Sequence, residues 1–156
     1  MERKNIPFIP LDALTHALDH TYPQFQIRSG GWETIPDKFY PFLRELVKTM
    51  GWTLPSCVIE GDSFLPEHAE KLLKEFNVRC IFLGASHITL EDIKGKSVHD
   101  DWVSDLSKEE QDKIPEWLIS TSEMFRREAE KHNIPYFDMS ENREKKLEEA
   151  YSALFE

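Results

Sequence analysis

Four short apolar runs alternate with segments of helical periodicity, and this alternation constrains the fold more than any other feature of the sequence. The runs occupy 6–10, 56–61, 78–84 and 135–139. Each run has the length of a strand, and the second and third are apolar over most of their length, as in strands covered on both faces. Strands that alternate with helices favour a mostly parallel sheet between two helical layers. The predicted fold class is therefore α/β, with three layers in the order α/β/α.

Helices are predicted wherever apolar residues recur at intervals of three and four. They cover 11–22, 35–50, a segment that begins at Pro66, a long segment around 114–129, and a last one with Ser140 as its N-cap. Gly51 is expected at the C-terminal end of the second helix. Two irregular segments remain: 22–34 is rich in glycine and aromatic residues and is predicted to be a mobile loop, and 85–108 is a charged excursion.

Length and charge limit the classes of protein to which this chain belongs. Its 156 residues, 40% of them apolar, suit a single domain that spans 1–156. A formal net charge of -10, with basic residues mixed among acids, argues against binding to nucleic acid. The expected ligands are therefore small molecules or proteins.

The compartment is inferred from cysteines and from apolar stretches. Cys57 and Cys80 both lie inside apolar runs, where a small buried thiol is the ordinary interpretation and a reducing compartment follows. No apolar stretch approaches the ~20 residues that span a bilayer. The first five residues do not resemble a secretory signal. We expect a cytoplasmic protein with no membrane partner.

Several strings, taken in order, resemble the P-loop kinases of small substrates. They are NIPFIPLDAL (5–14), VIEGDSFLPE (58–67), VRCIFLG (78–84) and, after a charged excursion and a long helix, NIPYFDMSENREKKLEEA (133–150). The resemblance covers nearly the whole chain. It implies that full-length relatives transfer the γ-phosphoryl group of ATP, with Mg²⁺, to a small hydroxyl acceptor. It also places 22–34 on the acceptor side and 85–108 in the position of a lid.

The chain departs from this superfamily in one respect, because it lacks the Walker A sequence G-x4-G-K-[ST] that curls round phosphates. The nearest string, Gly95-Lys96-Ser97, has Leu90 where the motif needs glycine. Arg3, Lys4 and Asn5 resemble the end of a helix, and we expect the first strand, the loop and most of its helix to be missing by truncation or loss.

The missing segment has two expected consequences. The chain as written should bind ATP poorly and is expected to be inactive as a kinase. The strands that carry Cys57 and Cys80 should pair directly, leave a gap, or accept a strand from another chain, because unpaired backbone groups in a core cost free energy.

Carboxylates at strand ends are the main candidates for chemistry. Asp12 follows the first strand, where the resemblance implies an acid that orients or deprotonates the acceptor hydroxyl. The alternative role is a helix N-terminal acid favoured by the macrodipole. Glu60 and Asp62 end the second strand at the position that resembles Walker B, whose acid holds Mg²⁺. Asp62 could instead cap a turn with Ser63.

The remaining candidates are single residues, each with a structural alternative. His16 is assigned to the acceptor pocket, or with Asp12 and His20 to a metal site, and Trp32 to a pocket wall that could equally be core. Lys94 and Lys96 are lid cations or solvated surface charges. Ser140 lies at the turn that touches adenine in the family, or caps the last helix.

A second function, from another class, stays open at this point. A non-catalytic protein derived from the same fold could use its exposed sheet region to bind a partner or to form a homo-oligomer. The molar mass in solution separates this function from that of a monomeric enzyme.

Overall fold

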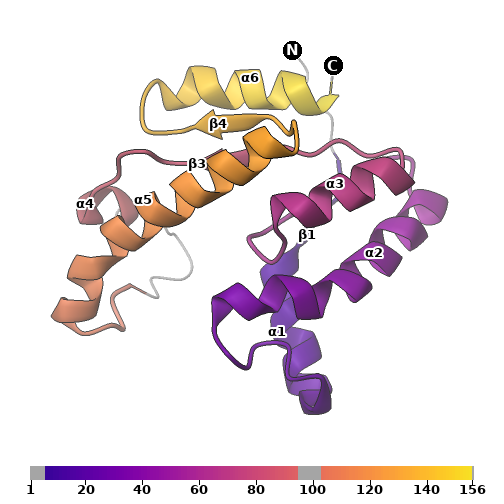
Figure 1. Cartoon of the computed structure of the whole chain (residues 1–156), viewed down its shortest axis with the longest axis horizontal. Helices are drawn as coiled ribbons and strands as arrows, with labels where there is room; N and C mark the ends of the chain where they lie inside the picture. Colours follow the sequence, from indigo (N-terminus) through magenta and orange to yellow (C-terminus); the bar gives the residue numbers. More distant parts are fainter. Residues whose placement is uncertain (1–5, 95–102, 156) are drawn as a thin grey trace. The chain divides into compact units, whose positions relative to one another are not determined.

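A computed structural model describes residues 6–94 and 103–155 of the chain. The chain divides into two compact units, Met1–Val78 and Arg79–Glu156, and each unit is described by itself (Figure 1). No helix among the described residues is long and apolar enough to cross a membrane.

The first unit is built on one parallel pair of strands. Its elements are, in order, β1 (Phe8–Pro10), α1 (Leu11–Thr21), two short 3₁₀ helices (Pro23–Phe25 and Trp32–Thr34), α2 (Ile35–Thr53), β2 (Val58–Glu60) and α3 (Pro66–Glu75). β1 pairs with β2 in a register that places Ile9 opposite Ile59 and Pro10 opposite Glu60. The predicted strands and helices of this unit are all present, although the strands are shorter than the apolar runs.

The core of the first unit joins its helices to its sheet. It consists of the buried side chains of Leu11, Ile27, Phe39, Leu43 and Leu72, with Ile59 and several half-buried apolar residues packed around them. Burying apolar side chains of this size contributes roughly 1.5–3 kcal/mol each. This burial explains why a sheet of only two short strands is held in place.

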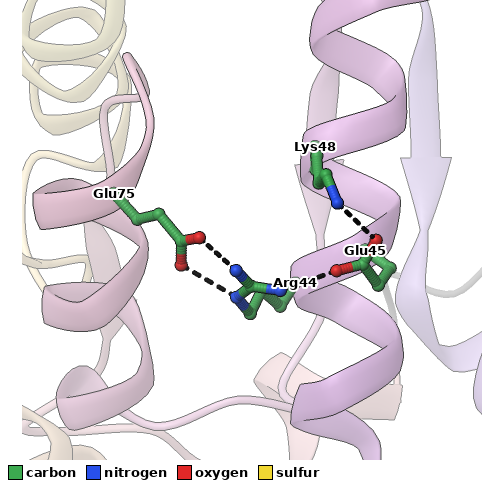
Figure 2. A network of polar contacts seen from close by, with 4 residues as sticks. All are labelled: Arg44, Glu45, Lys48 and Glu75. Carbon is green, nitrogen blue, oxygen red and sulfur yellow. Dashed lines mark hydrogen bonds and ion pairs between the residues drawn. The ribbon is translucent and has the colours of Figure 1, made fainter.

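An ion-pair network links α2 to α3 on the surface of the first unit (Figure 2). Arg44 reaches across to Glu75, to which its Nε donates over 2.8 Å, and a second nitrogen of the same guanidinium contacts the other carboxylate oxygen. On the α2 side Arg44 also contacts Glu45, which contacts Lys48. These side chains are partly exposed, so each pair contributes little to the free energy of unfolding.

The segment 22–34 differs from the predicted irregular loop, because it contains the two 3₁₀ helices. Lys38, on α2, donates from Nζ to the backbone carbonyls of Gln26 (2.8 Å) and Ser29 (2.5 Å). Ile27, between these two acceptors, is buried in the core. Because one ammonium group ties down two carbonyls around a buried anchor, the segment has a defined conformation. Gly51 differs too, because α2 continues through it to Thr53.

The second unit is also built on one parallel pair of strands. Its elements are β3 (Phe82–Gly84), α4 (Leu90–Lys94), α5 (Lys108–Lys131), β4 (Tyr136–Asp138) and α6 (Arg143–Phe155). β3 pairs with β4, with Leu83 opposite Phe137. α5 covers one face of this pair, where the rings of Phe82 and Phe125 stack with their centroids 5.4 Å apart.

The α5 helix begins earlier than its apolar periodicity indicates. Ser107 and Glu110 form a capping box, in which each side chain bonds to the backbone N–H of the other residue. The S-x-x-E spacing in the sequence could have identified this start. Pro115 lies inside the helix without ending it.

The predicted α/β class with parallel pairing is confirmed, but the strands form two sheets. Within 6–94 and 103–155, β1 pairs with β2, β3 pairs with β4, and no described strand joins β2 to β3. Of the three arrangements left open for the strands near Cys57 and Cys80, direct pairing is not found among the described strands. Residues 1–5, on which the helix-end interpretation of Arg3, Lys4 and Asn5 depends, lie outside the described residues.

Candidate functional site

The candidate site lies at the carboxyl ends of β1 and β2. Parallel strands end at the same edge of a sheet, and the register aligns Pro10 with Glu60. Asp12 and Asp62 each follow this aligned pair by two residues. The structure therefore brings together the three acids Asp12, Glu60 and Asp62, which the sequence suggested as candidates.

The carboxyl groups of these residues interact strongly. The pKa of Asp12 is raised to about 6, first by partial burial and then by the charge of Asp62, a hydrogen bond shared with Asp62, and the charge of Glu60. Ionising Asp12 places a second negative charge beside its neighbours, which is unfavourable. Asp12 and Asp62 form the close pair, and Glu60 acts through its charge alone.

Gly61 allows the end of β2 to approach the start of α1. Its φ is +147°, a conformation that side chains disfavour, and a Cβ built there would lie 2.8 Å from the Cβ of Leu11. Leu11 is fully buried and begins α1. A glycine between two acids thus lets the end of β2 pack against the start of the helix that carries Asp12.

Arg28 is a functional candidate that the sequence reasoning missed. Its positive charge acts on Asp12 and lowers the pKa of that carboxyl, against the effect of the neighbouring acids. The backbone N–H of Arg28 donates to Asp19 (3.1 Å), and the preceding residue, Ile27, is buried. No motif marks this arginine, since the fold of 22–34 is what brings it near Asp12.

His16 lies on α1, the helix that also carries Asp12, and Trp32 lies in the second 3₁₀ helix. His16 and His20 are exposed on α1, with their rings 6.2 Å apart in an edge-on arrangement. Trp32 is half-buried in the second 3₁₀ helix. Among the described residues, neither Asp12, His16 and His20 nor Asp12, Glu60 and Asp62 bring three ligand atoms close enough together to hold a metal ion between them.

A different set of side chains, Asp37, Glu67 and His68, has the spacing of a metal site. One ligand atom of each lies within 4.8 Å of the others. However, His68 Nδ1 accepts a hydrogen bond from the backbone N–H of Leu65 (3.2 Å), so the neutral ring carries its proton on Nε2 and donates to Asp37 (3.1 Å). A metal at Nε2 would move that proton to Nδ1 and break the bond to Leu65. We assign the cluster a structural role.

The environment of His68 agrees with this role. Only 2% of the side chain is exposed, and its ring stacks on Tyr40 with centroids 4.7 Å apart. Burial lowers the pKa of His68, with a contribution from Lys71, whereas Glu67 and Asp37 act to raise it. The ring is therefore neutral at pH 7 and ties the start of α3 to the start of α2.

The predicted lid and adenine-turn residues belong to the second unit. Lys94 donates from Nζ to the side chain of Gln111 (2.5 Å), which joins α4 to α5. Ser140 lies three residues before α6, so it is not the N-cap of that helix. Its hydroxyl oxygen accepts the backbone N–H of His87 over 2.8 Å. Lys96 lies outside the described residues.

Asp138, at the carboxyl end of β4, completes the turn around Ser140. One of its oxygens accepts the backbone N–H groups of Ser86 (3.2 Å) and Ser140 (3.0 Å). Burial acts to raise the pKa of Asp138, but the hydrogen bonds from Ser86 and Ser140 outweigh it and hold the pKa well below the usual range. This carboxylate is committed to joining two loops.

Comparison with known proteins adds no assignment. No protein-family model, curated protein or solved structure matches the chain.

Proposed function

We propose that the carboxylate cluster of Asp12, Glu60 and Asp62 is the Mg²⁺-binding and acceptor side of a phosphotransferase site. The observation that carries the proposal is the position of Asp12 and Asp62 beside each other at the carboxyl ends of two parallel strands. In open α/β sheets, ligands bind outside the carboxyl ends of the strands. Mg²⁺ takes oxygen ligands and usually uses one or two carboxylates, with water and phosphate in its other positions.

Each carboxylate has a role in this proposal. Asp12, with a pKa near 6, is mostly ionised at pH 7 and able to accept a proton from an acceptor hydroxyl. Asp62 would hold the ion directly, because it is the acid in contact with Asp12, and Glu60 would add negative charge. Bound Mg²⁺ supplies the positive charge that phosphoryl transfer needs.

On the nucleotide side of the proposed site no residue of this chain is assigned to the triphosphate, because the sequence contains no Walker A string. Lys94 and Ser140 stay proposals for the lid and the adenine turn. The finer fold, a three-layer P-loop kinase-like sheet without its first strand, is part of the same proposal. It is supported by the parallel sense of both strand pairs and by the helix that follows each strand.

A cation titration tests the carboxylate site. Mg²⁺, and Mn²⁺ as a paramagnetic probe, are titrated into the protein while the Asp12 and Asp62 resonances are followed by NMR. We expect saturable binding that Asp12→Asn and Asp62→Asn weaken tenfold or more. Glu109→Gln, which removes an exposed acid of α5, is the control for loss of charge alone. Equal binding by all variants would reject the site.

A nucleotide titration by calorimetry tests the other side. We expect weak binding of Mg·ATP, because the backbone cradle for the phosphates is missing from the sequence. Tight binding to the 156-residue chain would contradict the importance assigned to the absent loop.

We propose, as a second candidate function, a non-catalytic binding protein that uses an exposed part of a sheet. The observation that favours it is exposure of apolar strand residues: 58% of Phe8 in β1 and 50% of Leu83 in β3 are exposed. Parallel sheets are normally covered on both faces. Sedimentation equilibrium separates self-association from binding to another protein, because only the former raises the molar mass of the isolated chain.

A further inference from the structure

The two outer edges of the β1–β2 sheet differ in their backbone groups. Val58 donates its backbone N–H to the carbonyl of Pro7 (2.8 Å), so Val58 faces β1. Because residues of a parallel strand face alternate sides, the N–H and C=O of Ile59 point away from β1, toward the outer edge of β2. By the same alternation Phe8 and Pro10 face the outer edge of β1.

Within the first unit, one of these edges carries a proline and the other has no strand paired to it. Pro10 has no N–H, and proline at an edge is a common means of preventing further strand pairing. On β2 the outward-facing residues are Cys57, Ile59 and Gly61, and none of them is proline or charged. Among the described residues no strand pairs with this edge. The side chain of Ile59 packs against the core, so the edge is fixed in place.

The chemistry at one end of this edge is strongly acidic. Asp62 lies two residues after Glu60, the last residue of β2, and Asp12 lies two residues after Pro10, which is aligned with Glu60. A cation at this end of the edge would be attracted by their negative charge. A segment that extends along β2 therefore gains most if its end near Asp62 is basic.

We propose that the outer edge of β2 binds an extended apolar segment of another protein, with a lysine or arginine at the end that lies beside Asp12 and Asp62. Its backbone bonds to Cys57, Ile59 and Gly61 in the manner of β-strand addition, and its basic side chain pairs with the carboxylates. This inference rests on the second of the functions proposed above and needs neither ATP nor a metal ion.

Synthetic peptides test the proposal. The probe is an acetylated peptide of alternating threonine and valine that ends in glycine and two lysines, added to ¹⁵N-labelled protein without divalent cations. We expect the amide resonances of Cys57, Ile59 and Gly61 to shift, and hydrogen exchange at Ile59 to slow at least tenfold. The amide of Phe8, on the blocked edge of β1, should not change.

Two matched peptides separate backbone pairing from simple charge attraction. A peptide with glutamates in place of both lysines should bind at least tenfold more weakly. A peptide N-methylated at the alternate residues that face β2 should lose binding, whereas methylation of the other residues should leave it intact. Binding that ignores N-methylation, or shifts confined to other residues, would overturn the proposal, as would no binding at millimolar peptide.

Self-association is the remaining alternative. If exchange at Ile59 slows as the protein alone is concentrated, the edge belongs to a second copy of this chain and the proposed partner is wrong. Failure of the peptide test leaves the Mg²⁺ titration untouched, because that titration follows the carboxyl groups of Asp12 and Asp62 rather than the Ile59 amide.

Discussion

The two units end their parallel strand pairs with acids in opposite electrostatic states. In the first unit Asp12 lies against Asp62, and the pKa of Asp12 is raised to about 6. In the second unit Asp138 accepts backbone N–H groups from Ser86 and Ser140, and its pKa is held low. The same strand topology thus gives one set of carboxylates that repel each other and one carboxylate that is stabilised by backbone hydrogen bonds.

This difference separates a candidate site from a structural joint. A carboxylate with its oxygens committed to backbone donors gains little from a cation, whereas crowded carboxylates gain a great deal. Crowding also lowers the free energy of unfolding, so it is retained in proteins mainly where function needs it. The carboxylates of the first unit are therefore the better candidates for ligand binding.

The largest effect is expected at Gly61, which makes the crowding in the first unit geometrically attainable. Gly61→Ala should lower the free energy of unfolding by roughly 2–4 kcal/mol, because it combines a positive φ with a contact on buried Leu11. Urea denaturation measures the loss. Gly51→Ala is the control, since no atom lies within 4 Å of a Cβ built there and the position is helical. It should stabilise the protein by about 0.5–1 kcal/mol. Equal stability of wild type and Gly61→Ala would contradict the close packing.

In the second unit, Asp138→Asn should cost about 1–3 kcal/mol at pH 7, because two backbone donors lose a charged acceptor. The pKa of Asp138 is lowered in the folded state, so this contribution exists above its ordinary value of 3.8 and disappears as the pH falls below it. The difference between wild type and variant should therefore shrink in acid. Asp112→Asn, at an exposed position of α5, is the control and should be neutral.

The strands follow from the sequence, because each apolar run is a local pattern, and parallel pairing was expected from the alternation of strands with helices. Asp12, Glu60 and Asp62 are close together since each lies at or just after the carboxyl end of a strand of the same parallel pair. The position of Arg28 was not predictable, because it depends on Lys38 binding two carbonyls of a segment without periodicity. The separate sheets were not predictable either, since a run such as 78–84 shows where a strand can form and not what it pairs with.

In the first unit Asp12→Asn should raise the free energy of unfolding, whereas Asp138→Asn should lower it. The pKa of Asp12 is higher in the folded protein than the ordinary value of 3.8, so ionising it destabilises the fold as the pH rises from that value to about 6. Asp12→Asn should remove this slope and raise the unfolding free energy at pH 7 by about 1 kcal/mol or less, since solvent screens the exposed side of the cluster. Urea denaturation at both ends of the range measures it. A variant less stable than wild type at pH 7 would show that Asp12 is a structural acid like Asp138.

The smallest effect is expected at Arg28, and it tests whether charge alone sets the state of Asp12. Arg28 lowers the pKa of Asp12, so Arg28→Gln should raise that pKa further, by a few tenths of a unit at moderate salt, because exposed charges are screened. The carboxyl carbon of Asp12, followed by NMR through a pH titration, reports the shift. Arg28→Lys keeps the positive charge, so the pKa of Asp12 in this variant should stay close to that in the wild type. Asp138, whose pKa depends on Ser86 and Ser140, should titrate unchanged in both variants. If Arg28→Gln leaves Asp12 unchanged, the carboxyl crowding and burial alone set its pKa, and the proposed acceptor side has no arginine.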